Sequence, residues 1–156
     1  MSTNPYARYV EGKDVLECLH ETPQRIATLV RAWPALRFEQ SHAPGKWTGR
    51  QVLIHLAHIE MVASVRLRFV LAADAHVIQT FEQDDWMRVD HEGTAADALG
   101  AYLALRRLNL ALVRALSPDQ RAKAGMHPDF GPISVDWIME WLAGHELNHL
   151  PQFTAG

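Results

Sequence analysis

The chain has one cysteine, Cys18, in 156 residues, so it forms neither an internal disulfide nor a cysteine-rich zinc site. No apolar run approaches the roughly 18 residues of a membrane span. The polar first fourteen residues lack the hydrophobic segment of a secretory signal. Basic residues are scattered and the net charge is −3, which argues against a nucleic-acid partner. These absences predict a cytoplasmic protein that binds neither membranes nor nucleic acids.

The composition is that of one globular domain covering residues 1–156. Hydrophobic residues make up 48% and charged residues 21%, which is ordinary for a folded domain of this length. Cys18 is expected to pack as a small apolar residue rather than to react as a thiol. Four arginines are expected on solvated helix faces: Arg66, Arg68, Arg106 and Arg107.

Apolar residues recurring at helical spacing predict four long helices. They cover about residues 13–33, 49–72, 95–116 and 135–150. Thr48 and Gln51 form a capping-box pattern at the start of the second helix, and Thr94 and Ser134 are expected to cap the third and fourth. Pro23 either marks the restart of a helix capped by Thr22 or kinks a continuous one.

The segments between these helices read as connections. Residues 35–46, 73–93 and 125–132 are expected to be a connector, a long polar connection and a loop, with a short helical turn at 117–120. A helix of about 22 residues is roughly 33 Å long, and twenty extended residues reach roughly 66 Å. The long connection can therefore return along a whole helix. The prediction is an all-α four-helix bundle in up-down-down-up order, with the long crossover between the second and third helices.

The most informative motif is His145-Glu146-Leu147-Asn148-His149, near the end of the fourth helix. Histidines four residues apart lie on one helix face and can share a metal ion. His55, in the second turn of the second helix, is the best third ligand. The predicted topology makes these two helices antiparallel, so all three histidines meet at one end of the bundle. His58 is expected behind the ligands or at the surface, and no specific role is expected for five others: His20, His42, His76, His91 and His127.

Three neutral imidazoles leave a divalent ion with an open coordination position, as in catalytic sites. That position can hold a water of lowered pKa or a deprotonated thiol. Zinc or nickel is expected ahead of iron or manganese, although three histidines do not by themselves choose the metal. Trp47, Trp137 and Trp141 are expected in the core, or as aromatic walls of a metal cleft.

The string His-Glu-x-x-His also fits the zincin protease pattern, in which the glutamate is the general base. Zincins commonly take their third ligand downstream, however, and the sequence ends at Gly156. An all-helical chain also offers no edge strand to hold a peptide. Glu146 is therefore kept as a candidate catalytic base outside a protease, with a solvated glutamate as the alternative.

Three segments resemble one family. The segment from Trp47 to Leu56 is similar to the one that opens the second helix of DinB-like proteins of the DinB/YfiT superfamily. Residues 145–153, with two histidines four apart followed by glutamine and phenylalanine, resemble the closing motif of that family, and Gln83-Asp84-Asp85-Trp86 resembles its central crossover. Pro151 departs from the pattern, and because it removes a backbone donor and crowds the carbonyl of Leu147, a distorted last helical turn is expected at His149.

The resemblance implies a homodimeric up-down-down-up bundle with a divalent metal on His55, His145 and His149. It implies a small-molecule substrate and either hydrolysis or transfer and isomerisation with a thiol such as bacillithiol, mycothiol or glutathione. The alternative hypothesis is a non-catalytic dimeric stress-response protein that binds a metal or another ligand.

Overall fold

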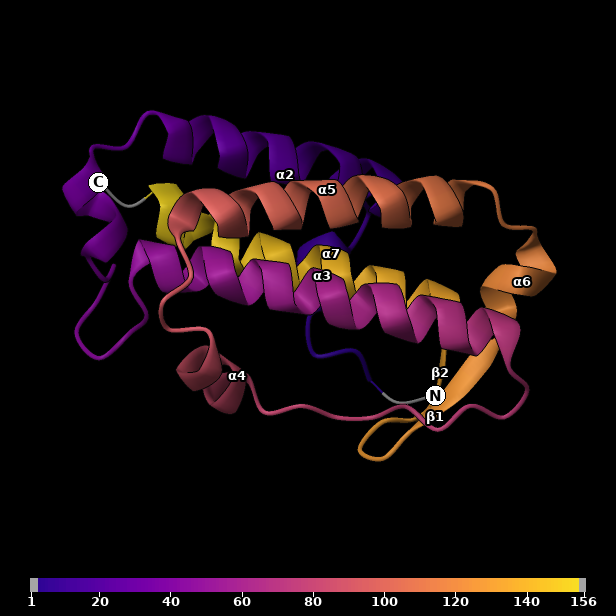
Figure 1. Cartoon of the computed structure of the whole chain (residues 1–156). Helices are drawn as coiled ribbons and strands as arrows, with labels where there is room; N and C mark the ends of the chain where they lie inside the picture. The colour runs from indigo at the N-terminus through magenta and orange to yellow at the C-terminus, as the bar shows by residue number, and fades with distance from the viewer. Residues whose placement is uncertain (1–2, 155–156) are drawn as a thin grey trace.

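The computed structural model describes residues 3–154. Four long helices form the bundle: α2 (Val15–Arg31), α3 (Gly49–Ala72), α5 (Ala95–Arg114) and α7 (Val135–Thr154). Figure 1 shows α3 and α5 running in one direction and α2 and α7 in the other. The predicted four-helix bundle is confirmed. The prediction of a single domain over residues 1–156 extends beyond the described range and stays a prediction.

The helix starts follow from side chains that satisfy free backbone N–H groups. The Thr48 hydroxyl accepts from the N–H of Gln51, and the Gln51 side chain accepts from the N–H of Thr48, so the predicted capping box is confirmed. The Thr94 hydroxyl accepts from the N–H of Asp97 at the start of α5, and the Ser134 hydroxyl accepts from the N–H of Trp137 at the start of α7. Because Thr48 caps α3, the helix begins at Gly49 and His55 lies in its second turn.

Neither proline inside a long helix ends it. Helix α2 runs through Pro23, so the restart at Thr22 is wrong. Helix α7 continues through Pro151 to Thr154. The distortion expected at Pro151 does not displace His149, whose Nε2 stays 3.2 Å from the Nε2 of His145.

The long crossover carries a helix that the sequence did not predict. Helix α4 (Gln83–Val89) lies within the connection of residues 73–93 (Figure 1). His58 of α3 holds the end of α4 to the bundle, with its Nε2 2.7 Å from a carboxylate oxygen of Asp90. The Trp86 ring packs edge-on against the His58 ring at 5.3 Å. Three shorter helices lie outside the crossover: α1 (Ala7–Val10) precedes α2, η1 (Ala35–Glu39) lies between α2 and α3, and α6 (Pro118–Ala122) lies between α5 and α7.

The all-α fold class is confirmed, and a small β-hairpin corrects one of the predicted loops. Strands β1 (Ala124–His127) and β2 (Gly131–Ser134) pair antiparallel where a loop over residues 125–132 was expected. Gly125 is required there, because a Cβ atom on it would lie 2.9 Å from Val70 and 3.0 Å from Ile78. His127, predicted in a loop or on an outer face, is 5% exposed in β1.

Two apolar clusters fill the bundle, one toward each end. One contains Leu19, Leu67, Leu110 and Leu142, and the other contains Ile26, Leu53, Tyr102 and Phe153. Buried polar residues lie near the boundary of the two clusters, among them Glu60 on α3, Arg106 on α5 and Glu146 on α7. Within residues 3–154, no helix is both long and apolar enough to span a bilayer.

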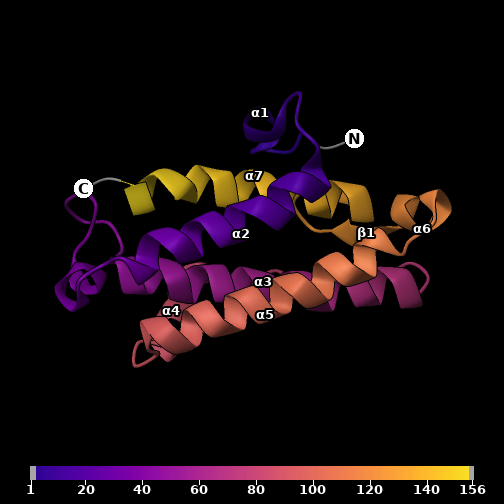
Figure 2. The ribbon, with the colours of Figure 1, turned by 90° about the horizontal axis from the view of Figure 1, so that it is seen from above.

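Helix α1 lies across α7 (Figure 2). The two backbones approach closely at Gly144, where an added Cβ atom would lie 2.5 Å from the carbonyl oxygen of Tyr6. This contact brings the Tyr6 ring edge-on to the next residue, His145, at 5.2 Å. The N-terminal segment therefore covers one side of a predicted ligand.

Candidate metal centre

The three predicted ligands converge in the structure. The Nε2 of His145 lies 3.1 Å from that of His55 and 3.2 Å from that of His149. One nitrogen from each ring falls within 4.8 Å of the others. His55 comes from the start of α3, and the other two come from consecutive turns near the end of α7. Antiparallel packing of α3 and α7 brings these helix ends together (Figure 1).

The spacing of the nitrogens fits a divalent ion. Ligands about 2.0–2.1 Å from a tetrahedral zinc ion lie about 3.3 Å apart. Adjacent ligands of an octahedral ion lie about 3.0 Å apart. The two distances to the Nε2 of His145, 3.1 and 3.2 Å, fall between these values. The ligand nitrogens of His55 and His149 lie within 4.8 Å of each other, so the cluster suits a metal without selecting its identity.

Burial keeps the imidazoles neutral, which is the form that binds a metal. Desolvation lowers the pKa of His55 to about 3, helped by the charges that His149 and His58 would carry. Desolvation also lowers the pKa of His145 well below its ordinary value and, less strongly, that of His149. The cluster therefore presents lone pairs rather than positive charges to a cation near neutral pH.

Neighbouring side chains fix the ring orientations. The Trp141 ring stacks on His145 with centroids 4.8 Å apart, and the Trp47 ring lies 4.9 Å from His55. The Nδ1 of His149 is 3.2 Å from the Gln152 side-chain oxygen. The amide oxygen of Gln152 accepts a hydrogen bond from a protonated Nδ1, which leaves the Nε2 of His149 free as a ligand atom.

Two of the three tryptophans expected in the core or as walls of a metal cleft, Trp47 and Trp141, pack against the histidine cluster. A cavity of about 250 Å³ opens beside His149. Trp47 and Gln152 line it together with Gln83 and Asp84 from the start of α4. The acidic-aromatic segment of the crossover is therefore part of the entrance to the histidines.

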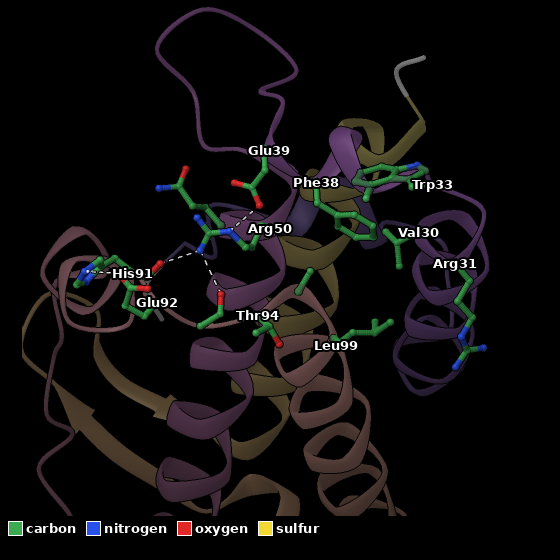
Figure 3. Close-up of a pocket in the computed structure, with 15 residues that line it drawn as sticks. Val30, Arg31, Trp33, Phe38, Glu39, Arg50, His91, Glu92, Thr94 and Leu99 are labelled. Carbon is green, nitrogen blue, oxygen red and sulfur yellow. Dashed lines mark hydrogen bonds and ion pairs between the residues drawn. The ribbon is translucent and has the colours of Figure 1, made fainter.

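Another cavity, of about 820 Å³, lies between the ends of α2, α3 and α5 (Figure 3). None of the three histidines lines it. Its central cation, Arg50, contacts the Glu39 carboxylate and the carbonyl oxygens of His91 and Gly93. The chemistry is therefore assigned to the smaller cavity, which reaches the cluster.

The sequence pattern of the DinB superfamily matches residues 19–153. The chain belongs to the DinB superfamily. YfiT of Bacillus subtilis, named "Putative metal-dependent hydrolase YfiT", is 26% identical over 152 residues, covering 92% of this chain and 85% of its own. A protein of Oceanobacillus iheyensis with the same designation is 30% identical over 120 residues, covering 76% of this chain and 70% of its own.

Two solved structures share the fold of this DinB-superfamily chain. Bacillus subtilis YfiT, described as having an unusual four-helix bundle topology, matches with a TM-score of 0.82 and 22% identity, covering 99% of this chain and 86% of YfiT. TT2238, described as a four-helix bundle protein, matches with a TM-score of 0.67 and 21% identity, covering 91% and 97%. Both likenesses support the bundle.

Glu146 of this DinB-superfamily chain does not lie in solvent, so the alternative of a solvated glutamate is wrong. It is 1% exposed, and its Oε2 accepts from Arg106 at 3.0 Å. Burial, with the nearby Glu60 carboxylate, raises the pKa of Glu146 well above its ordinary value. Its role as a catalytic base stays a prediction.

Arg106 was also predicted on a solvated face, and this was wrong, because it is 3% exposed. Its Nε and Nη2 donate to the Oε1 of Glu60, at 2.8 and 2.5 Å. Helical spacing could have found it, since Arg106 is four residues from both Tyr102 and Leu110, and all three are buried. His58 is buried as well, with its Nε2 against Asp90.

The lowered pKa values predict an acid-sensitive fold for the metal-free DinB-superfamily chain. Below about pH 6.5 the unfolded chain protonates its histidines, whereas the folded cluster resists protonation down to about pH 3 at His55. The free energy of unfolding should therefore fall as the pH drops through this range. Each buried histidine contributes up to about 1.4 kcal/mol per pH unit.

Urea unfolding of the metal-free protein between about pH 7 and pH 5 measures this loss. His55→Gln should flatten the dependence, and His20→Gln, at an exposed position on α2, should leave it unchanged. Identical slopes in the wild type and in His55→Gln would contradict the assignment.

Proposed function

We propose that this chain is a metal-dependent hydrolase of small molecules, with a divalent cation held by His55, His145 and His149. The convergence of three neutral imidazoles beside an open cavity carries the proposal. The names of the YfiT and Oceanobacillus relatives, which designate metal-dependent hydrolases, support it. When bound, such a cation supplies a Lewis acid that lowers the pKa of a water molecule to about 7.

The remaining residues bind, orient and exclude water. Trp141 and Trp47 cover the rings of His145 and His55, which lowers the local polarity around the ligand nitrogens. Gln152 holds His149 in one tautomer. Gln83 and Asp84 line the entrance, where they offer an amide and a carboxylate to a polar substrate.

The test begins with protein purified without an affinity tag. We expect about one equivalent of divalent metal per chain by elemental analysis. We also expect the protein to hydrolyse some members of a panel of esters, amides and phosphoesters. A chelator should abolish this hydrolysis, and added metal should restore it. A His55→Ala/His149→Ala double variant is the control, and equal metal content in the two proteins would reject the site.

The same panel is run with glutathione-like thiols, because the open position of a three-histidine site can also hold a thiolate. Turnover that requires the thiol would identify a transferase or isomerase. Metal binding without turnover in either arm would favour the non-catalytic binding protein. Assembly as a homodimer remains a proposal from the family resemblance, which sedimentation measures, and a cytoplasmic location remains a proposal from the sequence.

A further inference from the structure

A single buried side chain, Arg106 of α5, contacts each of the other three long helices. Its Nη1 donates to the Leu19 carbonyl of α2 and to the Oε2 of Glu146 on α7, both at 3.0 Å. Its Nε and Nη2 donate to Glu60 of α3. The planar guanidinium directs these donors in fixed directions, so its contacts constrain the relative positions of the helices.

The two glutamates adjoin the histidine cluster. Glu146 directly follows His145 on α7, and Glu60 lies five residues after His55 on α3. At 1.5 Å per residue, Glu60 is about 7.5 Å along the helix axis from His55. The guanidinium therefore joins α3 and α7, the helices that supply the ligand nitrogens, within about two turns of them.

The apolar clusters on either side do not fix this alignment as strictly, because hydrophobic contact has no preferred direction. A hydrogen bond of 3.0 Å is largely lost by about 3.6 Å, so the Arg106 contacts tolerate little sliding. Further hydrogen bonds support Glu60: Asn109 donates to its Oε2 at 2.9 Å, and Ser64 donates to Asn109 at 2.7 Å. The network is thus held from both α3 and α5.

We propose that Arg106, Glu60 and Glu146 form a positioning group that aligns α3 with α7, so that the nitrogens of His55, His145 and His149 meet. Glu146 acts through its contact with Arg106. This inference rests on the proposed metal-dependent function, and it predicts that residues remote from the cation control its affinity.

Arg106→Lys tests whether the several donors of the guanidinium are needed, because one ammonium group cannot reproduce the contacts to α2, α3 and α7 together. We expect zinc to bind about 10- to 100-fold more weakly, as measured by competition with a chromophoric chelator. We also expect a changed visible absorption spectrum when cobalt(II) replaces zinc. Leu110→Ala, one turn away on α5, is the matched control, since it loosens the buried core but removes none of the hydrogen bonds of the network.

Glu146→Gln and Glu146→Leu form the second pair. Glutamine keeps an oxygen that accepts from Arg106, so zinc affinity should stay within about threefold of wild type. Leucine removes that acceptor and should weaken binding about 10- to 100-fold. If Glu146→Leu fails to fold, Arg106→Lys and Glu146→Gln still decide the question.

Zinc affinities of Arg106→Lys and Glu146→Leu equal to wild type, in folded proteins, would overturn the inference and leave the proposed function intact. An equal loss of affinity in Leu110→Ala would also overturn it, because loosening alone would then explain the effect. If the wild type binds no zinc, the proposed function fails. The positioning role is then judged on the metal-free protein, in which Arg106→Lys should shift the histidine-ring ¹H–¹⁵N signals and Leu110→Ala should not.

Discussion

Replacing His145 by alanine should weaken zinc binding about a thousandfold. Apparent binding free energies of structural zinc sites are about 10–16 kcal/mol, so one of three protein ligands accounts for about 4 kcal/mol. His145 is the strongest choice, because its Nε2 is within 3.2 Å of the Nε2 atoms of both other ligands. Its loss leaves two nitrogens on opposite helices.

Competition with a chelator of known affinity measures this effect. His91→Ala is the matched control, since the His91 side chain is 66% exposed and its ring nitrogens lie beside the Glu92 carboxylate and the Arg88 carbonyl, away from the three ligands. The control should bind zinc like the wild type. A loss below tenfold for His145→Ala would mean that the cluster does not hold the metal.

Replacing Arg106 by methionine should cost about 3–5 kcal/mol of unfolding free energy, which is the typical cost of breaking a buried ion pair. Methionine approximates the volume of the arginine stem but removes the positive charge that pairs with the buried Glu60 and Glu146. Removing one member of a buried ion pair lowers the free energy of unfolding by more than the intact pair contributes to it, because the remaining carboxylates are kept out of water without a compensating charge.

Urea unfolding measures the loss, with Arg107→Met as the control. Arg107 is the exposed neighbour on the same helix, so its replacement should change the free energy by less than about 0.5 kcal/mol. A charge-free triple variant, Glu60→Gln/Arg106→Met/Glu146→Gln, should recover part of the loss, since no unpaired charge stays buried. A triple variant less stable than Arg106→Met alone would show that charge burial is not the cause.

The helices were predictable because their signals are local. Apolar spacing and caps such as Thr48 lie within a few residues of what they determine. To predict that His55 meets His145, only the lengths of the connections were needed in addition, because they indicate which helices run antiparallel. By contrast, the partners of Arg106, Glu60 and Glu146, are 46 and 40 residues away in the sequence. No local signal indicates these pairs, so Arg106 was predicted to lie in solvent.

The hairpin was missed for another physical reason. Each strand has only four residues, and Gly125, Gly131 and Pro132 resemble a loop. Its pairing depends on tertiary contacts, including the bonds between the backbones of Met126 and the crossover at Ile78 and His76. Helix α4 is seven residues long and likewise depends on contacts outside itself, through His58 and Asp90.

The close contact between Tyr6 and Gly144 requires glycine directly before the first histidine of the closing motif. The backbone of the N-terminal turn occupies the space that any side chain at position 144 would need. A residue other than glycine before the first histidine must lift that turn away and uncover the edge of the His145 ring. Homologous chains that wrap their N-termini in this way should therefore read Gly-His-x-x-x-His, which makes the arrangement recognisable without coordinates.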